Sequence, residues 1–148
     1  MIRLILMVMC TMGLQADGVK AVVFDYLGVV GELSPMIQAD ERVLDLVKQL
    51  KGAGYRVGIL SNLSKRAAEK VKQEEFIKLF DPVMFSYEIG ATKPSSKVYF
   101  ALIKKLGVKP EEILFIDDSL VNVKGAKDVG INEIHYTGFE ELIDGLDL

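Results

Sequence analysis

The most informative stretch of this sequence is Val22-Val23-Phe24-Asp25-Tyr26-Leu27-Gly28, where an apolar run gives way to a carboxylate and then to a glycine. The β-rich residues 19–25 are typical of a strand that helices cover on both faces. In an open α/β sheet, ligands bind at the carboxyl ends of the strands. We therefore expect Asp25 to lie at a binding edge, with partners that come from other strand ends.

Strand-like and helix-like segments alternate along the rest of the chain. Their apolar spacing predicts helices over residues 39–50, 65–72, 75–80, 94–106, 120–129 and 139–143, and further strands over residues 55–60, 83–85, 112–116 and 131–136. This alternation predicts an α/β fold of three layers, Rossmann-like, with a central parallel sheet of about five strands and helices on both faces.

Length and composition limit the classes of function. A chain of 148 residues, half of them hydrophobic and 26% charged, suits one globular domain, which we place at residues 19–148. A net charge of -3 gives no reason to expect a nucleic-acid partner. The single cysteine, Cys10, permits no internal disulfide, so the cytoplasm is the expected compartment.

Residues 1–18 form an apolar N-terminal segment with three open interpretations. In order of preference they are an extension packed on the domain or on a second copy in a homodimer, a mis-assigned start before Met12, and a signal peptide over residues 1–16. A bilayer span takes about 20 apolar residues, so no stable membrane span is expected.

Polar side chains follow three of the predicted strands, and a lysine opens the helix before one of them. Parallel strands bring their carboxyl ends to one edge, so these groups should face one pocket. Carboxylates suit Mg²⁺, whereas a lysine and a serine suit phosphate oxygens. The set is Asp25, Ser61, Asn62, Lys93, Asp117 and Asp118.

Four segments in this order resemble the motifs of the haloacid dehalogenase superfamily of aspartate-nucleophile hydrolases. They are residues 22–30 (VVFDYLGVV), residues 58–62 (GILSN), Lys93-Pro94, and residues 116–119 (IDDS) with Asn122. The resemblance extends over nearly the whole chain from Lys20 onward. The first motif resembles most the branch of sugar-1-phosphate phosphatases and of the phosphatase-like domains of epoxide hydrolases.

The resemblance implies a Mg²⁺-dependent phosphatase in which Asp25 attacks phosphorus and becomes an aspartyl-phosphate. Mg²⁺ would lie between Asp25, the carbonyl of Leu27 and Asp118, and Asp117 would bind it through water or orient Asp118. The substrate would be a phosphorylated small molecule or macromolecule.

The same resemblance assigns substrate contacts to Ser61, Asn62 and Lys93. The lysine would also be catalytic, because it lowers the repulsion between Asp25 and the incoming anion.

Leu27 departs from the pattern. The phosphatases of this superfamily commonly carry a second aspartate two residues after the nucleophile, as the general acid and base, and such a group contributes typically ~10²–10⁴-fold. Two alternatives therefore stay open: a phosphate-binding or regulatory module with little or no activity, and a hydrolase similar to 2-haloacid dehalogenases.

Relatives that act on small metabolites usually insert a cap domain after the first motif or between the second and third. Here only residues 30–39 and 63–92 are available, which is too few for a further domain. We therefore expect a protein without a cap, with an open site that suits a macromolecule or is closed by a partner subunit.

Overall fold

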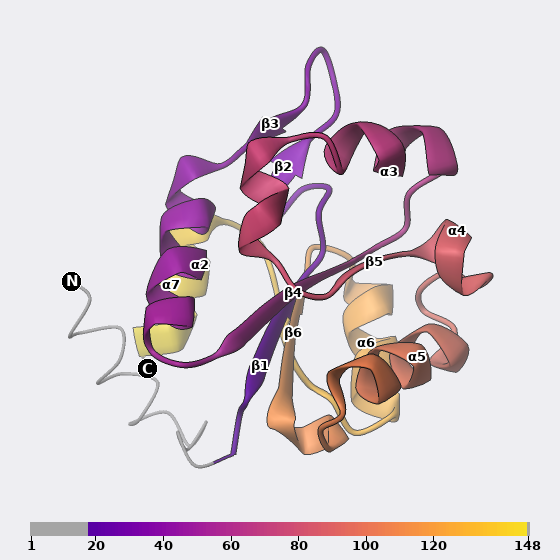
Figure 1. Ribbon diagram of the computed structural model, residues 1–148. Coiled ribbons are helices and arrows are strands. Elements are labelled where there is room, and N and C mark those ends of the chain that lie inside the picture. Colours follow the sequence, from indigo (N-terminus) through magenta and orange to yellow (C-terminus); the bar gives the residue numbers. More distant parts are fainter. Residues whose placement is uncertain (1–17, 148) are drawn as a thin grey trace.

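The computed structural model describes residues 18–147 and shows a five-stranded parallel sheet with strand order β5-β4-β1-β6-β7 (Figure 1). The strands of this sheet are β1 (Ala21–Phe24), β4 (Arg56–Ser61), β5 (Val83–Phe85), β6 (Ile113–Asp117) and β7 (Asn132–His135). The predicted α/β fold is confirmed, and β1 is its central strand.

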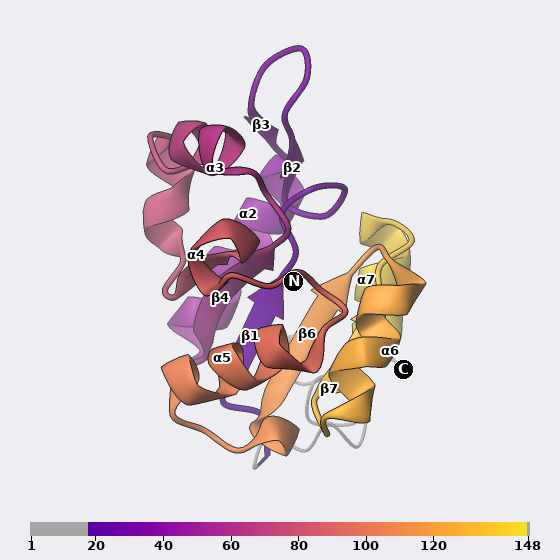
Figure 2. The same ribbon diagram turned by 90° about the vertical axis from the view of Figure 1, so that its right-hand side faces the viewer.

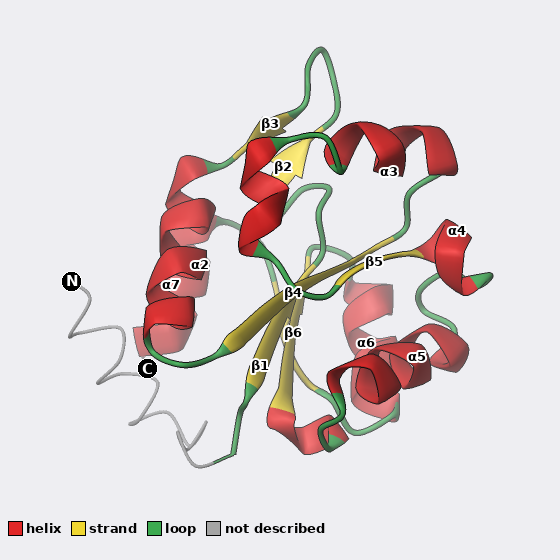
Figure 3. Cartoon of the chain, in the orientation of Figure 1, coloured by secondary structure: helices red, strands yellow, loops and turns green. Residues whose placement is uncertain are grey.

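Helices lie on both faces of the sheet. They are α2 (Glu41–Gly52), α3 (Lys65–Val71), α4 (Ser86–Ile89), α5 (Ser96–Leu106), α6 (Leu120–Asp128) and α7 (Phe139–Asp147), with 3₁₀ turns η1 (Glu75–Leu79) and η2 (Pro110–Glu112). Figure 3 shows α2 and α7 on one side of the strands and α5 and α6 on the other.

The side chains of the central strand alternate between the two layers of the core. Val22 and Phe24 pack in the cluster with α2, whereas Ala21 and Val23 pack in the cluster with α5. All four are almost fully buried. Because both faces of β1 are covered, its sequence is continuously apolar instead of alternating.

A short antiparallel hairpin, which we did not predict, follows the first motif. Its strands β2 (Gly31–Glu32) and β3 (Gln38–Ala39) pair outside the main sheet, next to α3 (Figure 2). Two-residue strands carry too few positions for a detectable apolar alternation. The helix α4 was also missed, because its four residues make about one turn and are too few for a detectable helical apolar spacing.

The helix bounds differ from the predicted ones by a few residues. The predicted helix over residues 39–50 begins later because the Asp40 side chain accepts a hydrogen bond from the Arg42 N–H and so caps α2. The terminal helix α7 runs past residue 143, the predicted end, to Asp147.

The N-terminal predictions fall on residues 1–18, of which only Gly18 lies among the described residues. From Gly18 to Asp147, no helix combines the length and the apolar character that crossing a bilayer requires.

We expect Leu102→Ala to lower the free energy of unfolding by about 2–5 kcal/mol, the usual range for a leucine removed from a close-packed core. Leu102 is fully buried on α5. The matched control is Phe100→Ala on the same helix, where the side chain is 57% exposed and the change should stay within about 0.5 kcal/mol. Urea unfolding measures both, and equal effects would contradict the described packing.

Candidate active site

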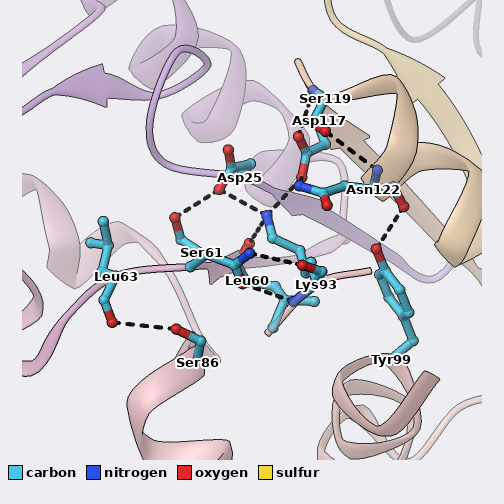
Figure 4. A network of polar contacts seen from close by, with 11 residues as sticks. Asp25, Leu60, Ser61, Leu63, Ser86, Lys93, Tyr99, Asp117, Ser119 and Asn122 are labelled. Atoms are coloured by element: carbon cyan, nitrogen blue, oxygen red, sulfur yellow. Dashed lines mark hydrogen bonds and ion pairs between the residues drawn. The ribbon is translucent and has the colours of Figure 1, made fainter. Parts of the chain in front are cut away.

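The register of the sheet brings three polar side chains together at one edge. Phe24 of β1 lies opposite Ile59 of β4 and Ile116 of β6. Asp25, Ser61 and Asp117, which come one or two positions later, therefore meet at the carboxyl ends of these strands. Figure 4 shows them arranged around the Lys93 ammonium group.

The Lys93 ammonium group is the centre of this arrangement. Its Nζ donates to Asp25 Oδ1 at 2.9 Å, to Asp117 Oδ2 at 2.6 Å and to the Leu60 carbonyl at 2.9 Å. The residue is only 4% exposed, and its Nζ lies 5.2 Å from the centroid of the Phe115 ring. An ammonium group has three N–H donors, and these contacts use all three. In this arrangement Lys93 therefore supplies positive charge and holds the carboxylates in position.

Asn62 contacts the main chain of Lys93. Its Nδ2 donates to the Lys93 carbonyl at 3.0 Å, and its Oδ1 accepts from the Lys93 N–H at 2.9 Å. The Asn62 side chain also lines the pocket next to Asp25. The geometry thus gives Asn62 a positioning role toward Lys93, beside the substrate contact predicted from the sequence.

Asp25 is held through only one of its carboxylate oxygens. Oδ1 accepts from Ser61 Oγ at 2.7 Å as well as from Lys93. Within residues 18–147, no protein group donates a hydrogen bond to Oδ2 of Asp25. The bonds to Oδ1 fix the side chain, and Oδ2 stays available for a cation or for an electrophile.

Asp117 is bonded through both oxygens. Oδ2 accepts from Lys93 and from Asn122 Nδ2 at 3.1 Å, and Oδ1 accepts from the Ser119 N–H at 2.8 Å. The residue is fully buried. These contacts hold Lys93, Asn122 and the main chain of Ser119, so in this arrangement Asp117 positions Lys93, and its predicted roles toward Mg²⁺ or Asp118 stay predictions.

Asp118 reaches the pocket directly. Its carboxylate packs against the α-carbon of Gly28, where a side chain would collide with it and where φ is +76°. The pocket of about 370 Å³ is lined by Asp25, Leu27, Gly28, Glu32, Ser61, Asn62, Lys93, Asp118 and Asn122. Oxygens of Asp25, Asp117 and Asp118 lie within 4.8 Å of one another.

The electrostatics of the site favour a divalent cation. Burial raises the pKa of Asp25, and repulsion from Asp117 adds to this while Lys93 opposes it. The pKa of Asp118 is raised by burial and by the charges of Asp25 and Asp117. When ionised, the three aspartates exceed the charge of the one ammonium group by two, before Glu32, which also lines the pocket, is counted. Hard oxygen ligands with this charge fit Mg²⁺, which Asp25 and Asp118 would hold.

The structure adds two residues that the sequence did not assign to the site. Tyr99 Oη donates to the Asn122 carbonyl at 2.6 Å and so links α5 to α6 behind Asp117. Glu32 of the hairpin lines the pocket. The hairpin that carries Glu32 has no periodic pattern in the sequence by which it could have been found.

Comparison with known proteins identifies similar sequences. The sequence profile of a hydrolase family, described as haloacid dehalogenase-like hydrolase, matches residues 11–130. A glyceraldehyde 3-phosphate phosphatase from Methanopyrus kandleri is 33% identical over 91 residues, which cover 60% of this chain and 39% of the relative. The chain spans about half or less of the length of the curated relatives it matches.

Two solved structures are similar in fold. An uncharacterized protein from Corynebacterium glutamicum superposes with a TM-score of 0.73 at 26% identity, covering 88% of this chain and 97% of that one. The HAD family enzyme BT-2542 from Bacteroides thetaiotaomicron, an aspartate-to-alanine mutant in complex with magnesium and inorganic phosphate, has a TM-score of 0.62 at 26% identity. The match covers 72% of this chain and 60% of that enzyme.

We expect Asp118→Asn to raise the free energy of unfolding of the metal-free protein at neutral pH and to change it little at about pH 3. The raised pKa of Asp118 means that its contribution to stability is present below the ordinary aspartate pKa and is lost as pH rises through the raised value. Asparagine cannot lose a proton and so avoids this loss.

Thermal unfolding with a chelator, measured across this pH range, checks the prediction. The matched control is Asp45→Asn, because Asp45 is an exposed aspartate paired with Lys48 on α2. A gain from Asp118→Asn that is the same at both pH values would contradict the described electrostatics.

Proposed function

This chain belongs to the haloacid dehalogenase-like hydrolase family, and we propose that it is a Mg²⁺-dependent phosphatase that hydrolyses a phosphate monoester through an aspartyl-phosphate at Asp25. The observation that carries the proposal is the asymmetry of Asp25. One oxygen of its carboxylate is bonded to Ser61 and Lys93, and the other faces a pocket with a second carboxylate, Asp118. The phosphatase among the relatives and the magnesium–phosphate complex among the similar structures support the same reaction.

In the first step, the carboxylate of Asp25 attacks phosphorus, an O–P bond forms to the aspartate, and the bond from phosphorus to the leaving oxygen breaks. The two hydrogen bonds on Oδ1 hold the carboxylate at the wall of the pocket that Asp25 lines. Positioning of this kind, together with charge stabilisation, provides most of the catalysis in phosphoryl transfer.

The positive charge of Lys93 reduces the repulsion between Asp25 and an anionic phosphoryl group. Its three N–H donors are engaged by protein acceptors, so in this arrangement it acts through its charge and not through a direct bond to the substrate. The one hydroxyl proton of Ser61 is donated to Asp25 Oδ1, so in this arrangement Ser61 holds the nucleophile, and its predicted contact with a phosphoryl oxygen would require this bond to turn to the substrate. A bound Mg²⁺, held by Asp25, Asp118 and the Leu27 carbonyl, would neutralise the charge of the transferring group.

In the second step, water attacks the aspartyl-phosphate, inorganic phosphate leaves and the Asp25 carboxylate is restored. Asp117 stays a positioning residue in both steps, because its oxygens hold Lys93, Asn122 and the Ser119 N–H.

We infer that the substrate reaches the site without a cap domain in this chain. The interval after the first motif contains only the β2–β3 hairpin, and the interval over residues 63–92 contains α3, η1, β5 and α4. Such an open site suits a phosphorylated macromolecule, or a phosphorylated small molecule if a second copy of the chain closes the pocket. We also propose that the protein is located in the cytoplasm and forms a homodimer. No nucleic-acid partner is proposed.

The central test of the proposal is Asp25→Asn. We expect hydrolysis of 4-nitrophenyl phosphate to require Mg²⁺ and to fall by about 10⁴-fold or more in this variant, because the amide cannot act as the nucleophile. The control Asp45→Asn, on the surface of α2, should keep wild-type activity.

Other outcomes point to the alternatives. If a broad panel of phosphate esters is not turned over, while calorimetry detects binding of Mg²⁺ and phosphate, the protein is a phosphate-binding module. If a 2-haloacid releases halide instead, and Asp25→Asn stops the release, the chemistry is that of a dehalogenase.

A further inference from the structure

We propose that Glu32, on the β2–β3 hairpin, is the general acid and base of this site and replaces the proton-transfer group that the chain lacks at Leu27. The inference rests on the proposed phosphatase function, since only that reaction needs a proton at the leaving oxygen. It assigns a catalytic role to a residue outside the four motifs.

The backbone places Glu32 next to the position of the missing group. Leu27 and Gly31 are paired by an isolated parallel bridge, and the Gly28 N–H donates to the Gly31 carbonyl at 3.1 Å. The chain thus folds back after the first motif, and the residue after Gly31 enters the pocket that Asp25 and Asp118 also line. Glu32, an exposed residue, and Leu27, two residues after the nucleophile, therefore line the same pocket.

The hairpin is held firmly at this point. Tyr26, which is fully buried, has its Oη 3.3 Å from the Glu32 carbonyl and 3.4 Å from the Gln38 carbonyl, both as acceptors. At Gly31 an added Cβ would collide with the Gln38 carbonyl, so only glycine lets β2 and β3 approach this closely. Because Tyr26 shares one hydroxyl proton between two long contacts, the close approach at Gly31 is the main constraint on the strands beside Glu32.

Among residues 18–147, the Glu32 carboxylate has no competing partner. Within the part of the chain that the structure describes, it makes no side-chain hydrogen bond or ion pair. The other acids of the pocket have roles in the reaction: Asp25 attacks phosphorus, and Asp118 faces the cation. Lys93 has its three N–H donors engaged. Glu32 is the remaining carboxyl group that lines the pocket.

The proton balance of the two steps closes on this residue. In the first step, the protonated Glu32 gives its proton to the leaving oxygen as the O–P bond breaks, so the alcohol departs neutral. In the second step, the Glu32 carboxylate takes a proton from the attacking water, whose oxygen bonds to phosphorus as the bond to Asp25 breaks. Both groups return to their starting state.

The test compares Glu32→Gln with the wild type on phosphate esters of different leaving groups, in the presence of Mg²⁺. For glycerol phosphate, whose alkoxide is a poor leaving group, we expect kcat/KM to fall by about 10²–10⁴-fold. For 4-nitrophenyl phosphate, whose phenolate leaves without a proton, kcat/KM should stay within a few-fold of the wild type. In Glu32→Gln the second step should be slower, because the attacking water has lost its base. A burst of nitrophenolate and a phosphorylated protein should then appear, and acid quenching with intact-mass measurement detects the latter.

The matched control is Glu74→Gln. Glu74 is the other carboxylate whose charge acts on Tyr26, but it lines a different pocket and should leave both substrates unaffected. An equal fall of kcat/KM on the two esters, or no fall on either, would overturn the role of Glu32. The proposed function would still stand if the turnover depends on Asp25. If the wild type shows no turnover that Asp25→Asn abolishes, the proposed function itself is overturned. Circular dichroism and thermal unfolding of Glu32→Gln verify that the variant is folded.

Discussion

The buried ammonium group of Lys93 is the interaction on which the site depends. It joins the ends of three strands, since its acceptors are Asp25 after β1, the Leu60 carbonyl in β4 and Asp117 at the end of β6. A charge at this depth is costly unless it is paired and fully hydrogen-bonded. The carboxylates of Asp25 and Asp117 accept hydrogen bonds from the ammonium group, and its positive charge offsets part of their mutual repulsion. Burial of either the ammonium group or the carboxylates would therefore be destabilising without the other.

The site nevertheless carries more negative charge than the protein neutralises. The raised pKa values of Asp25 and Asp118 express this imbalance, and burial is the largest cause for both. Charge imbalance of this kind is expected where a protein is built to bind a cation or an electrophile, and it is a cost in the free protein. Loss of the Lys93 ammonium group would therefore increase the excess of negative charge in the site. Binding of a divalent cation would reduce it.

Much of the fold and of the candidate site was predictable because it rests on local patterns. The apolar run of β1 and the glycines after the helices gave the α/β alternation, and the four motifs gave Asp25, Ser61, Lys93 and the acidic pair. Contacts between distant segments were not predictable. Ser61 and Ser64 both resemble helix caps, but only Ser64 caps α3, while Ser61 bonds to Asp25. The pairing of Asn62 with the main chain of Lys93 and the place of Glu32 also depend on how separate loops meet, which spacing alone does not encode.

The phosphorylation of Asp25 is the central claim, and chemical trapping tests it most directly. The protein is mixed with Mg²⁺ and 4-nitrophenyl phosphate, quenched in acid within the first turnovers and treated with borohydride, which reduces an aspartyl-phosphate to homoserine. After digestion, mass spectrometry should locate homoserine at position 25 and at no other carboxylate. Turnover without any such product at position 25, or with the product at Asp117 or Asp118, would contradict the account.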